Sequence, residues 1–276
     1  MVSTALQLAQ LNERSLRINP TWYFTQTWDS VPTSFVRSYE LNNLPHKMFS
    51  TKKTTQPLKQ FLYLFFKFSW KFGERISFSI CRNYDLMSGV KISKRTLLIY
   101  GYMQKPEIFS PIRLEILELL RMSKSGEESL HQEILQYRQE GLRLVALHVR
   151  RGDRTNGTSS QDALSYKYYL EQLEKVNYSQ NKVLVFSDDI TWCREKFRNY
   201  NFNFVNEPSP LRSLKLMSLC DDFIISLSTF SWWAAWLSPS ANKRVIMPII
   251  PDNIQYSNWN DLSQADWEDA VADFEE

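Results

Sequence analysis

The sequence is poor in cysteine, and this argues against two kinds of small scaffold. Its 276 residues contain three cysteines, Cys81, Cys193 and Cys220. They lie far apart and form no Cys-x-x-Cys or Cys/His spacing, so neither a disulfide framework nor a structural zinc site is expected. Such cysteine usage is typical of a reducing compartment, and we expect a cytoplasmic location.

Long apolar runs are also lacking. The longest, Phe61–Phe66, ends at Lys67, whereas a membrane-spanning helix needs about 20 apolar residues. Residues 1–20 show no basic start followed by an apolar stretch, so they do not resemble a secretory signal. We therefore expect a soluble protein.

An excess of charge of one sign is missing as well. The 33 basic and 30 acidic side chains leave a net charge of +3, without a basic block. A nucleic-acid-binding protein usually carries a larger basic excess, so no nucleic-acid partner is expected. What the chain does contain is 43% hydrophobic and 14% aromatic residues. The aromatic side chains either enlarge the core or line a site for flat rings, and composition leaves both open.

The second half of the chain alternates apolar strands with helices. Strands are expected at 144–149, 183–186, 202–205, 223–227 and 244–247, with helices at 163–175, 191–200, 211–220 and 231–237 between them. Continuously apolar strands separated by helices predict a parallel sheet with helices on both faces, as in a Rossmann-like domain. Ligands of such sheets bind at the carboxyl ends of the strands.

The first half is less regular. We expect helices at 2–14, 111–122 and 129–140, a strand at 15–18 and a buried aromatic segment at 57–70. Apolar residues recur at helical spacing in the second of these helices, which makes that prediction more direct than the others.

Two arginines follow the first strand of the regular half. His148 lies near the end of that strand, and Arg150, Arg151, Gly152 and Asp153 come next. A guanidinium offers a fork of donors that matches phosphate oxygens, and glycine permits a turn. The same residues could form a solvated basic turn, and the pattern leaves both readings open.

Polar residues follow two further strands. Asp188 and Asp189 come after the second strand, where a carboxylate can accept hydrogen bonds from a nucleoside, although one of them could instead cap the next helix. Residues 228–231 supply hydroxyls at the start of a tryptophan-rich helix, a place that favours an anion. The basic pair, the acidic pair and the hydroxyls together fit a nucleoside diphosphate.

Three motifs carry a family resemblance: HVRRGD at 148–153, VFSDD at 185–189 and STFSWWAAWL at 228–237. In this order and spacing they resemble the α-1,2-fucosyltransferases, an inverting family of bacteria and animals classed as glycosyltransferase family 11. The segment Gly101–Gln104 is similar to that family too.

The resemblance implies an α/β fold of the GT-B type with two Rossmann-like domains. Residues 1–140 would form an acceptor-side domain without its first strand and glycine-rich loop, and residues 141–276 the domain that binds GDP-fucose. The implied reaction is the metal-free transfer of L-fucose, with inversion, from GDP-β-L-fucose to a galactose-type hydroxyl in surface-glycan or O-antigen synthesis. No cofactor is expected, and an oligosaccharide or lipid-linked acceptor would bring peripheral contact with the inner membrane face.

The resemblance also implies roles for individual residues. Arg151, with Arg150 beside it, would hold the diphosphate and stabilise the leaving group, while His148 would steady that loop. Asp153 is the candidate general base, or it braces the arginine loop. The nucleotide pocket would further comprise Asp188 or Asp189 for guanine, together with Ser228, Thr229, Phe230 and Ser231.

Two positions depart from the family pattern. The first glycine is Gly73, so no glycine-rich loop opens the chain, and Leu227 stands where the family usually has asparagine. These departures keep open a non-catalytic homologue that binds a GDP-sugar. An α-1,6- or protein O-fucosyltransferase is a further alternative, because it shares the HxRR-like element, but the FSWW stretch disfavours it.

Overall fold

The computed structural model describes residues 16–18, 49–51, 78–81, 96–99, 106–138, 141–155, 163–251 and 259–275. Contacts divide the chain into two units, Met1–Arg121 and Met122–Glu276. Helix α6 (Lys124–Tyr137) therefore falls in the second unit. The predicted division at residue 141 into an acceptor-side and a nucleotide-binding domain stays a prediction.

The first unit contains two parallel strand pairs and a helical segment. Its elements are β1 (Leu16–Ile18), β2 (Phe49–Thr51), β3 (Phe78–Cys81), β4 (Thr96–Ile99), α4 (Pro106–Phe109), η6 (Ser110–Ile112) and α5 (Arg113–Leu119). Strand β1 pairs with β2 and β3 with β4. The strand predicted at 15–18 is confirmed, and so is the helix predicted from 111, whose first turn is η6. The predictions for residues 2–14, 57–70 and 101–104 lie outside the described residues.

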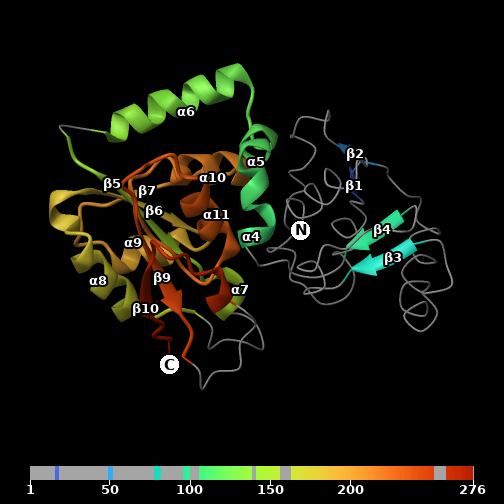
Figure 1. Cartoon of the computed structure of the whole chain (residues 1–276). Coiled ribbons are helices and arrows are strands. Elements are labelled where there is room, and N and C mark those ends of the chain that lie inside the picture. Colours follow the sequence, from blue (N-terminus) through green and yellow to red (C-terminus); the bar gives the residue numbers. More distant parts are fainter. Residues whose placement is uncertain are drawn as a thin grey trace. The chain divides into compact units, whose positions relative to one another are not determined.

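The second unit is built around a six-stranded, entirely parallel sheet (Figure 1). Its strands are β5 (Leu144–Val149), β6 (Lys182–Ser187), β7 (Asn203–Phe204), β8 (Asp222–Ile224), β9 (Arg244–Ile249) and β10 (Glu268–Val271). Strands β5 and β8 lie in the middle of the order β10-β9-β8-β5-β6-β7 and are buried along their whole length. The parallel sheet predicted from the apolar runs is confirmed.

Helices connect these strands. They are α7 (Gly152–Thr155), α8 (Tyr166–Lys175), α9 (Ile190–Lys196), α10 (Pro210–Ser218) and α11 (Thr229–Leu237), with short 3₁₀ turns at η7 (Tyr178–Gln180) and η8 (Asn260–Leu262). Because crossovers between parallel strands are right-handed, α8 and α9 cover one face and α10 and α11 the other. Helices α10 and α11 pack against one another (Figure 1).

Side-chain caps set the helix starts. Ser165, Asp189, Ser209 and Ser228 each accept a backbone N–H in the first turn of the following helix. The helix predicted at 129–140 begins earlier, at Lys124, because Ser123 accepts a hydrogen bond from the Gly126 amide. Polar residues fill that first turn, which is why apolar spacing did not reveal it.

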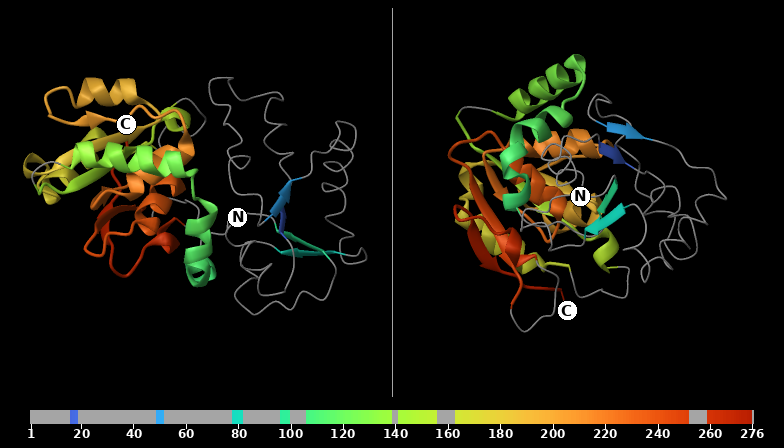
Figure 2. Two further views of the ribbon diagram at one scale, coloured as in Figure 1. Left: turned by 90° about the horizontal axis from the view of Figure 1, so that it is seen from above. Right: turned by 45° about the vertical axis from the view of Figure 1, so that its right-hand side comes forward.

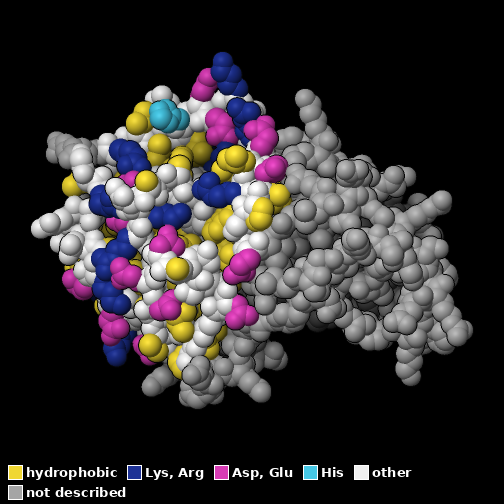
Figure 3. All heavy atoms as spheres, viewed as in Figure 1, with side chains coloured by type: hydrophobic (Ala, Val, Ile, Leu, Met, Phe, Trp, Pro, Cys, Tyr) yellow, Lys and Arg dark blue, Asp and Glu magenta, His cyan; other side chains and the backbone are white. Residues whose placement is uncertain are grey.

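Helix α6 lies along the outside of the second unit, at the top of Figure 1 and of the right-hand view of Figure 2. Side chains of both charge signs are interspersed over the face shown in Figure 3. This agrees with the small net charge of the sequence. Within the described part of the chain, every helix is too short or too polar to cross a membrane.

The order of the strands marks one place at the sheet edge. The chain runs outward from β5 to β6 and β7 and then returns to β8, on the other side of β5. The carboxyl ends of β5 and β8 therefore flank a topological switch point. In open α/β sheets ligands bind at this crevice.

Candidate functional site

A buried histidine joins the two strands at the switch point. Nδ1 of His148, near the end of β5, lies 2.7 Å from Oγ of Ser226, just after β8. Burial of the ring lowers the pKa of His148 to about 3, and the positive charge of Arg150 adds to this effect. His148 is therefore a neutral imidazole at neutral pH, and it links β5 to β8.

Asp188 holds the loop between β5 and α7. Its Oδ1 accepts the amide of Arg151 at 2.8 Å, and its Oδ2 accepts the amide of Gly152 at 3.1 Å. The guanidinium of Arg150 also reaches Oδ2, at 2.8 Å. Both carboxylate oxygens thus contact the arginine loop, while the recognition of guanine by Asp188 stays a prediction.

Asp189 caps helix α9. Its Oδ1 accepts the amide of Trp192 at 3.1 Å, which confirms the capping that the sequence left open for one of the two aspartates. Its Oδ2 lies 3.7 Å from Nε of Arg151. The carboxylate therefore faces a guanidinium as well as a helix start.

The two arginines point in different directions, although they are adjacent in the sequence. Alternation along an extended chain puts Arg150 on the same side as His148 and Arg151 on the opposite side. The Arg150 side chain is 24% exposed and pairs with Asp188. The Arg151 side chain is 10% exposed and forms an ion pair with Glu275, and its Cζ lies 4.0 Å from the centroid of the Trp192 ring. Arg150 is thus on the His148 side and is the more exposed of the two arginines, whereas the role of Arg151 in holding the diphosphate stays a prediction.

The start of α11 presents hydroxyls and an aromatic ring near the same edge. Ser228 caps the helix by accepting the Phe230 amide at 3.3 Å, and the Phe230 ring centroid lies 5.8 Å from that of His148. Thr229 is exposed and Phe230 half-buried, whereas Ser231 is buried and donates to the Ser228 carbonyl at 3.1 Å. The roles of these four residues in a pocket stay predictions.

The tryptophans of α11 belong mainly to the core, as expected. Trp232 and Trp236 are buried, Trp233 is half-buried, and Nε1 of Trp232 donates to the Leu262 carbonyl at 2.9 Å. Leu227, the departure from the family pattern, is also buried, in the turn before the helix. An apolar side chain at this position is therefore accommodated by its surroundings.

Asp153 lies within the short helix α7, directly after Gly152. Its predicted role as general base stays a prediction.

Among the residues that the structure describes, no three or more His, Cys, Asp or Glu side chains are grouped so that they could hold a metal ion. Burial raises the pKa of the Cys193 thiol to about 11, and Cys220 is shifted in the same direction, so both stay protonated.

Three residues of this edge were missed by the sequence analysis: Ser226, Trp192 and Glu275. Ser226 falls inside the strand predicted at 223–227, but β8 ends at Ile224 and leaves it in the turn. Trp192 carried a signal in its position directly after the aspartate pair. Glu275 carried none, because it lies 124 residues from Arg151 in the chain.

Comparison with known proteins gives a match to one family and to several curated relatives. The model of glycosyl transferase family 11 matches residues 71–270. The O-antigen biosynthesis glycosyltransferase WbnK of Escherichia coli is 30% identical over 180 residues, covering 60% of this chain and 59% of the relative. An alpha-1,2-colitosyltransferase of Escherichia coli is 29% identical over 147 residues, covering 48% and 44%. Galactoside alpha-(1,2)-fucosyltransferase 2 of Bos taurus is 27% identical over 166 residues, covering 55% and 48%.

The matched region spans about half the length of these relatives, from 44% to 59%. Among solved structures, the fucosyltransferase NodZ from Bradyrhizobium is similar with a TM-score of 0.49 and 13% identity, covering 86% of this chain and 88% of that one.

Proposed function

This chain belongs to glycosyl transferase family 11, and we propose on that basis that it transfers L-fucose from GDP-β-L-fucose to a galactose-type hydroxyl. The proposed linkage is α-1,2, formed with inversion. Two observations on relatives support the linkage, since a bacterial and an animal relative are both named as α-1,2 transferases. The proposed setting is the synthesis of an O-antigen or another surface glycan, as the name of WbnK suggests.

The observation that carries the proposal is the position of Arg150. Its guanidinium lies at the carboxyl edge of the sheet beside the switch point, and Asp188 holds it and its loop. When the bond between sugar and diphosphate breaks, negative charge builds on the departing GDP. A fixed guanidinium then stabilises the transition state more than the ground state. Arg150 is therefore the proposed donor to the diphosphate.

The neighbouring strand end supplies candidates for contact with the nucleoside. Thr229 is exposed, and the half-buried ring of Phe230 lies near His148. A hydroxyl can bond to ribose or phosphate, and a ring can pack on a base or sugar. We assign no metal to the reaction, because a guanidinium can neutralise the diphosphate charge that a divalent cation neutralises elsewhere.

The acceptor and location complete the proposal. We propose a cytoplasmic enzyme that meets a lipid-linked oligosaccharide at the inner membrane face. Fractionation of cells expressing the chain tests this. Recovery in the soluble fraction and, at low salt, on membranes is expected; recovery in an extracellular fraction would contradict it.

Binding and turnover together test the proposed activity. Calorimetry is expected to show GDP binding in the presence of EDTA, with UDP binding much more weakly. Incubation with GDP-fucose and a galactose-ended oligosaccharide should yield a product whose α-1,2 linkage is read by NMR. GDP-colitose is tested as a second donor substrate, because one relative is named a colitosyltransferase. GDP binding without transfer from either donor would favour the non-catalytic homologue, and equal binding of UDP would contradict the nucleotide assignment.

A further inference from the structure

The segment that follows β10 is fixed against the chain just before α8. The Ser165 amide donates to the Asp273 carbonyl at 2.8 Å, and the Glu275 amide donates to the Ala163 carbonyl at 2.9 Å. Leu164 and Phe274 form an antiparallel bridge between these contacts. The backbone of Glu275 is thus held in one place, and its side chain reaches Arg151.

The C-terminal segment and the start of α9 meet at the Arg151 guanidinium. One Nη atom forms an ion pair with Glu275, Cζ lies 4.0 Å from the ring centroid of Trp192, and Nε lies 3.7 Å from Oδ2 of Asp189. Within the described part of the chain, the buried Nε finds no hydrogen-bond acceptor. Glu275 and Trp192 are therefore the contacts that hold the guanidinium most closely.

The backbone of Arg151 is fixed as well. Its amide donates to Asp188 at 2.8 Å, and its carbonyl accepts the Thr155 amide at 3.0 Å. A guanidinium is planar and always charged, so a carboxylate and a ring face together define its orientation. Because the backbone and the side chain of Arg151 are both held, the neighbouring Arg150 has few accessible conformations. Such ordering in advance lowers the entropy that a ligand must remove on binding.

We propose that Glu275 and Trp192 are positioning residues that hold Arg151, so that the loop presents Arg150 to a nucleoside diphosphate. The inference rests on the proposed function in its choice of ligand. It assigns Arg151 a part in the site that differs from direct contact with the diphosphate. It also makes a residue far away in the sequence part of the donor site.

A pair of matched substitutions tests the proposal. Glu275→Gln removes the charge that faces Arg151 and keeps the side-chain shape. Glu268→Gln is the control, because it removes an ion pair with Arg244 at the opposite edge of the same sheet. Glu275→Gln is expected to weaken GDP binding by about tenfold, whereas Glu268→Gln should change it by less than about twofold. KM for the donor should rise with Glu275→Gln while kcat changes less, a split that a general loss of stability does not produce.

A double substitution shows whether Glu275 acts through Arg151. If it does, Arg151→Gln with Glu275→Gln should bind GDP as weakly as Arg151→Gln alone, because the second change removes a contact already lost. Trp192→Phe keeps a ring face and should bind GDP more tightly than Trp192→Ala.

Two results would overturn the inference while leaving the proposed function intact. Wild-type affinity in Glu275→Gln would show that the loop needs no such anchor. Tighter GDP binding would show that Glu275 competes with the diphosphate for a guanidinium. Failure of the wild-type chain itself to bind GDP would instead contradict the proposed function, and with it the ligand named here.

Discussion

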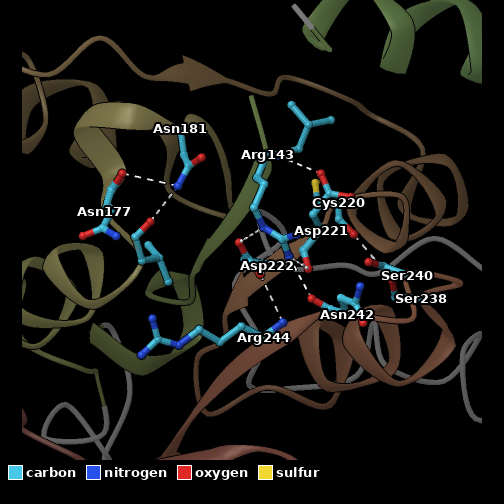
Figure 4. A network of polar contacts seen from close by, with 12 residues as sticks. Arg143, Asn177, Asn181, Cys220, Asp221, Asp222, Ser238, Ser240, Asn242 and Arg244 are labelled. Carbon is cyan, nitrogen blue, oxygen red and sulfur yellow. Dashed lines mark hydrogen bonds and ion pairs between the residues drawn. The ribbon is translucent and has the colours of Figure 1, made fainter. Parts of the chain in front are cut away.

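Both edges of the central sheet carry a pair of arginine and aspartate, but the two pairs have different roles. At the edge where the strands begin, Arg143 donates to both oxygens of Asp222, at 2.8 and 2.7 Å, and to the carbonyl of Asn242 at 2.9 Å (Figure 4). Asp222 is buried and also accepts the Arg244 amide at 3.1 Å. These contacts join the starts of β5, β8 and β9, so they stabilise the fold.

Asp221 extends this network. It accepts two hydrogen bonds from Arg138, at 2.9 and 3.0 Å, and the amide of Leu144 at 2.9 Å. Burial alone would raise the pKa of Asp221, but the hydrogen bonds from Arg138 and Leu144 outweigh it and lower the pKa. The charge of Asp221 is therefore balanced by groups of the protein itself.

At the opposite edge the paired aspartate is more exposed. Arg150 pairs there with Asp188, whose side chain is 25% exposed, against 7% for Asp222 and 14% for Asp221. Thr229, which follows β8, is exposed as well. An arginine and an aspartate that join strand starts contribute to stability. The same pair of residue types at the carboxyl edge lies beside the switch point, where open α/β sheets bind their ligands.

The largest effect is expected from breaking the network at the strand starts. Asp222→Ala removes the acceptor of two hydrogen bonds from Arg143 and of one from the Arg244 amide, and should lower the free energy of unfolding by about 3 kcal/mol. Urea unfolding followed by circular dichroism measures the change. The folded fraction should bind GDP with unchanged affinity. A stable Asp222→Ala protein would contradict the structural role given to this edge.

The next largest effect is on turnover. Arg150→Lys should lower kcat by about a hundred- to a thousandfold, nearly as much as Arg150→Ala, because a point charge cannot reproduce the guanidinium fork. The melting temperature should change little. Near-normal kcat in Arg150→Lys, measured with saturating donor, would show that this arginine does not act on the leaving group.

A smaller effect concerns pH and His148. The native pKa of about 3 lies below the ordinary 6.5, so the unfolded state takes up the proton first as the pH falls. Stability due to the neutral imidazole is complete above pH 6.5 and is lost toward pH 3, by up to about 1.4 kcal/mol per pH unit. The difference in melting temperature between wild type and His148→Gln should therefore shift in favour of the variant between pH 6.5 and 4.5. A difference in melting temperature that stays constant over this pH range would contradict a neutral His148 in the folded protein. The acidic groups do not affect the comparison, because both proteins contain them.

The smallest effect compares two helix caps. Ser209→Ala and Ser228→Ala each remove a cap and should each lower stability by about 1 kcal/mol. Ser228 follows β8, which flanks the switch point, whereas Ser209 follows the edge strand β7. Only the loss of Ser228 should therefore weaken GDP binding, measured by calorimetry. Equal affinity in the two variants would separate the α11 cap from the ligand site.

The sequence predicted the elements whose signal is local. The apolar run of β5 was predicted with its observed bounds, Leu144–Val149. Strand β10 was missed because two acidic residues lie in its four positions and only Ala270 is buried. Strand β10 forms because the side of β9 that faces away from β8 can pair with a further strand. That side exists only in the assembled sheet.

The candidate site shows the same limit. Arg150, Asp188 and residues 228–231 could be found because each follows a strand. The separation of Arg150 from Arg151 depends on what packs on each side of the loop, and the contact of Arg151 with Glu275 joins residues 124 positions apart. No local pattern encodes such contacts, which arise only when the sheet and its flanking segments assemble.

Hydrogen exchange with and without GDP tests most directly the claim that one edge of the sheet binds the nucleotide and the other holds the fold. GDP is expected to slow exchange at the amides of 148–152, 187–189 and 226–231. The amides of 143–144, 221–222 and 244, at the strand starts, should exchange as in the free protein. Protection centred on the strand starts, or no protection at the three carboxyl-end segments, would contradict the account.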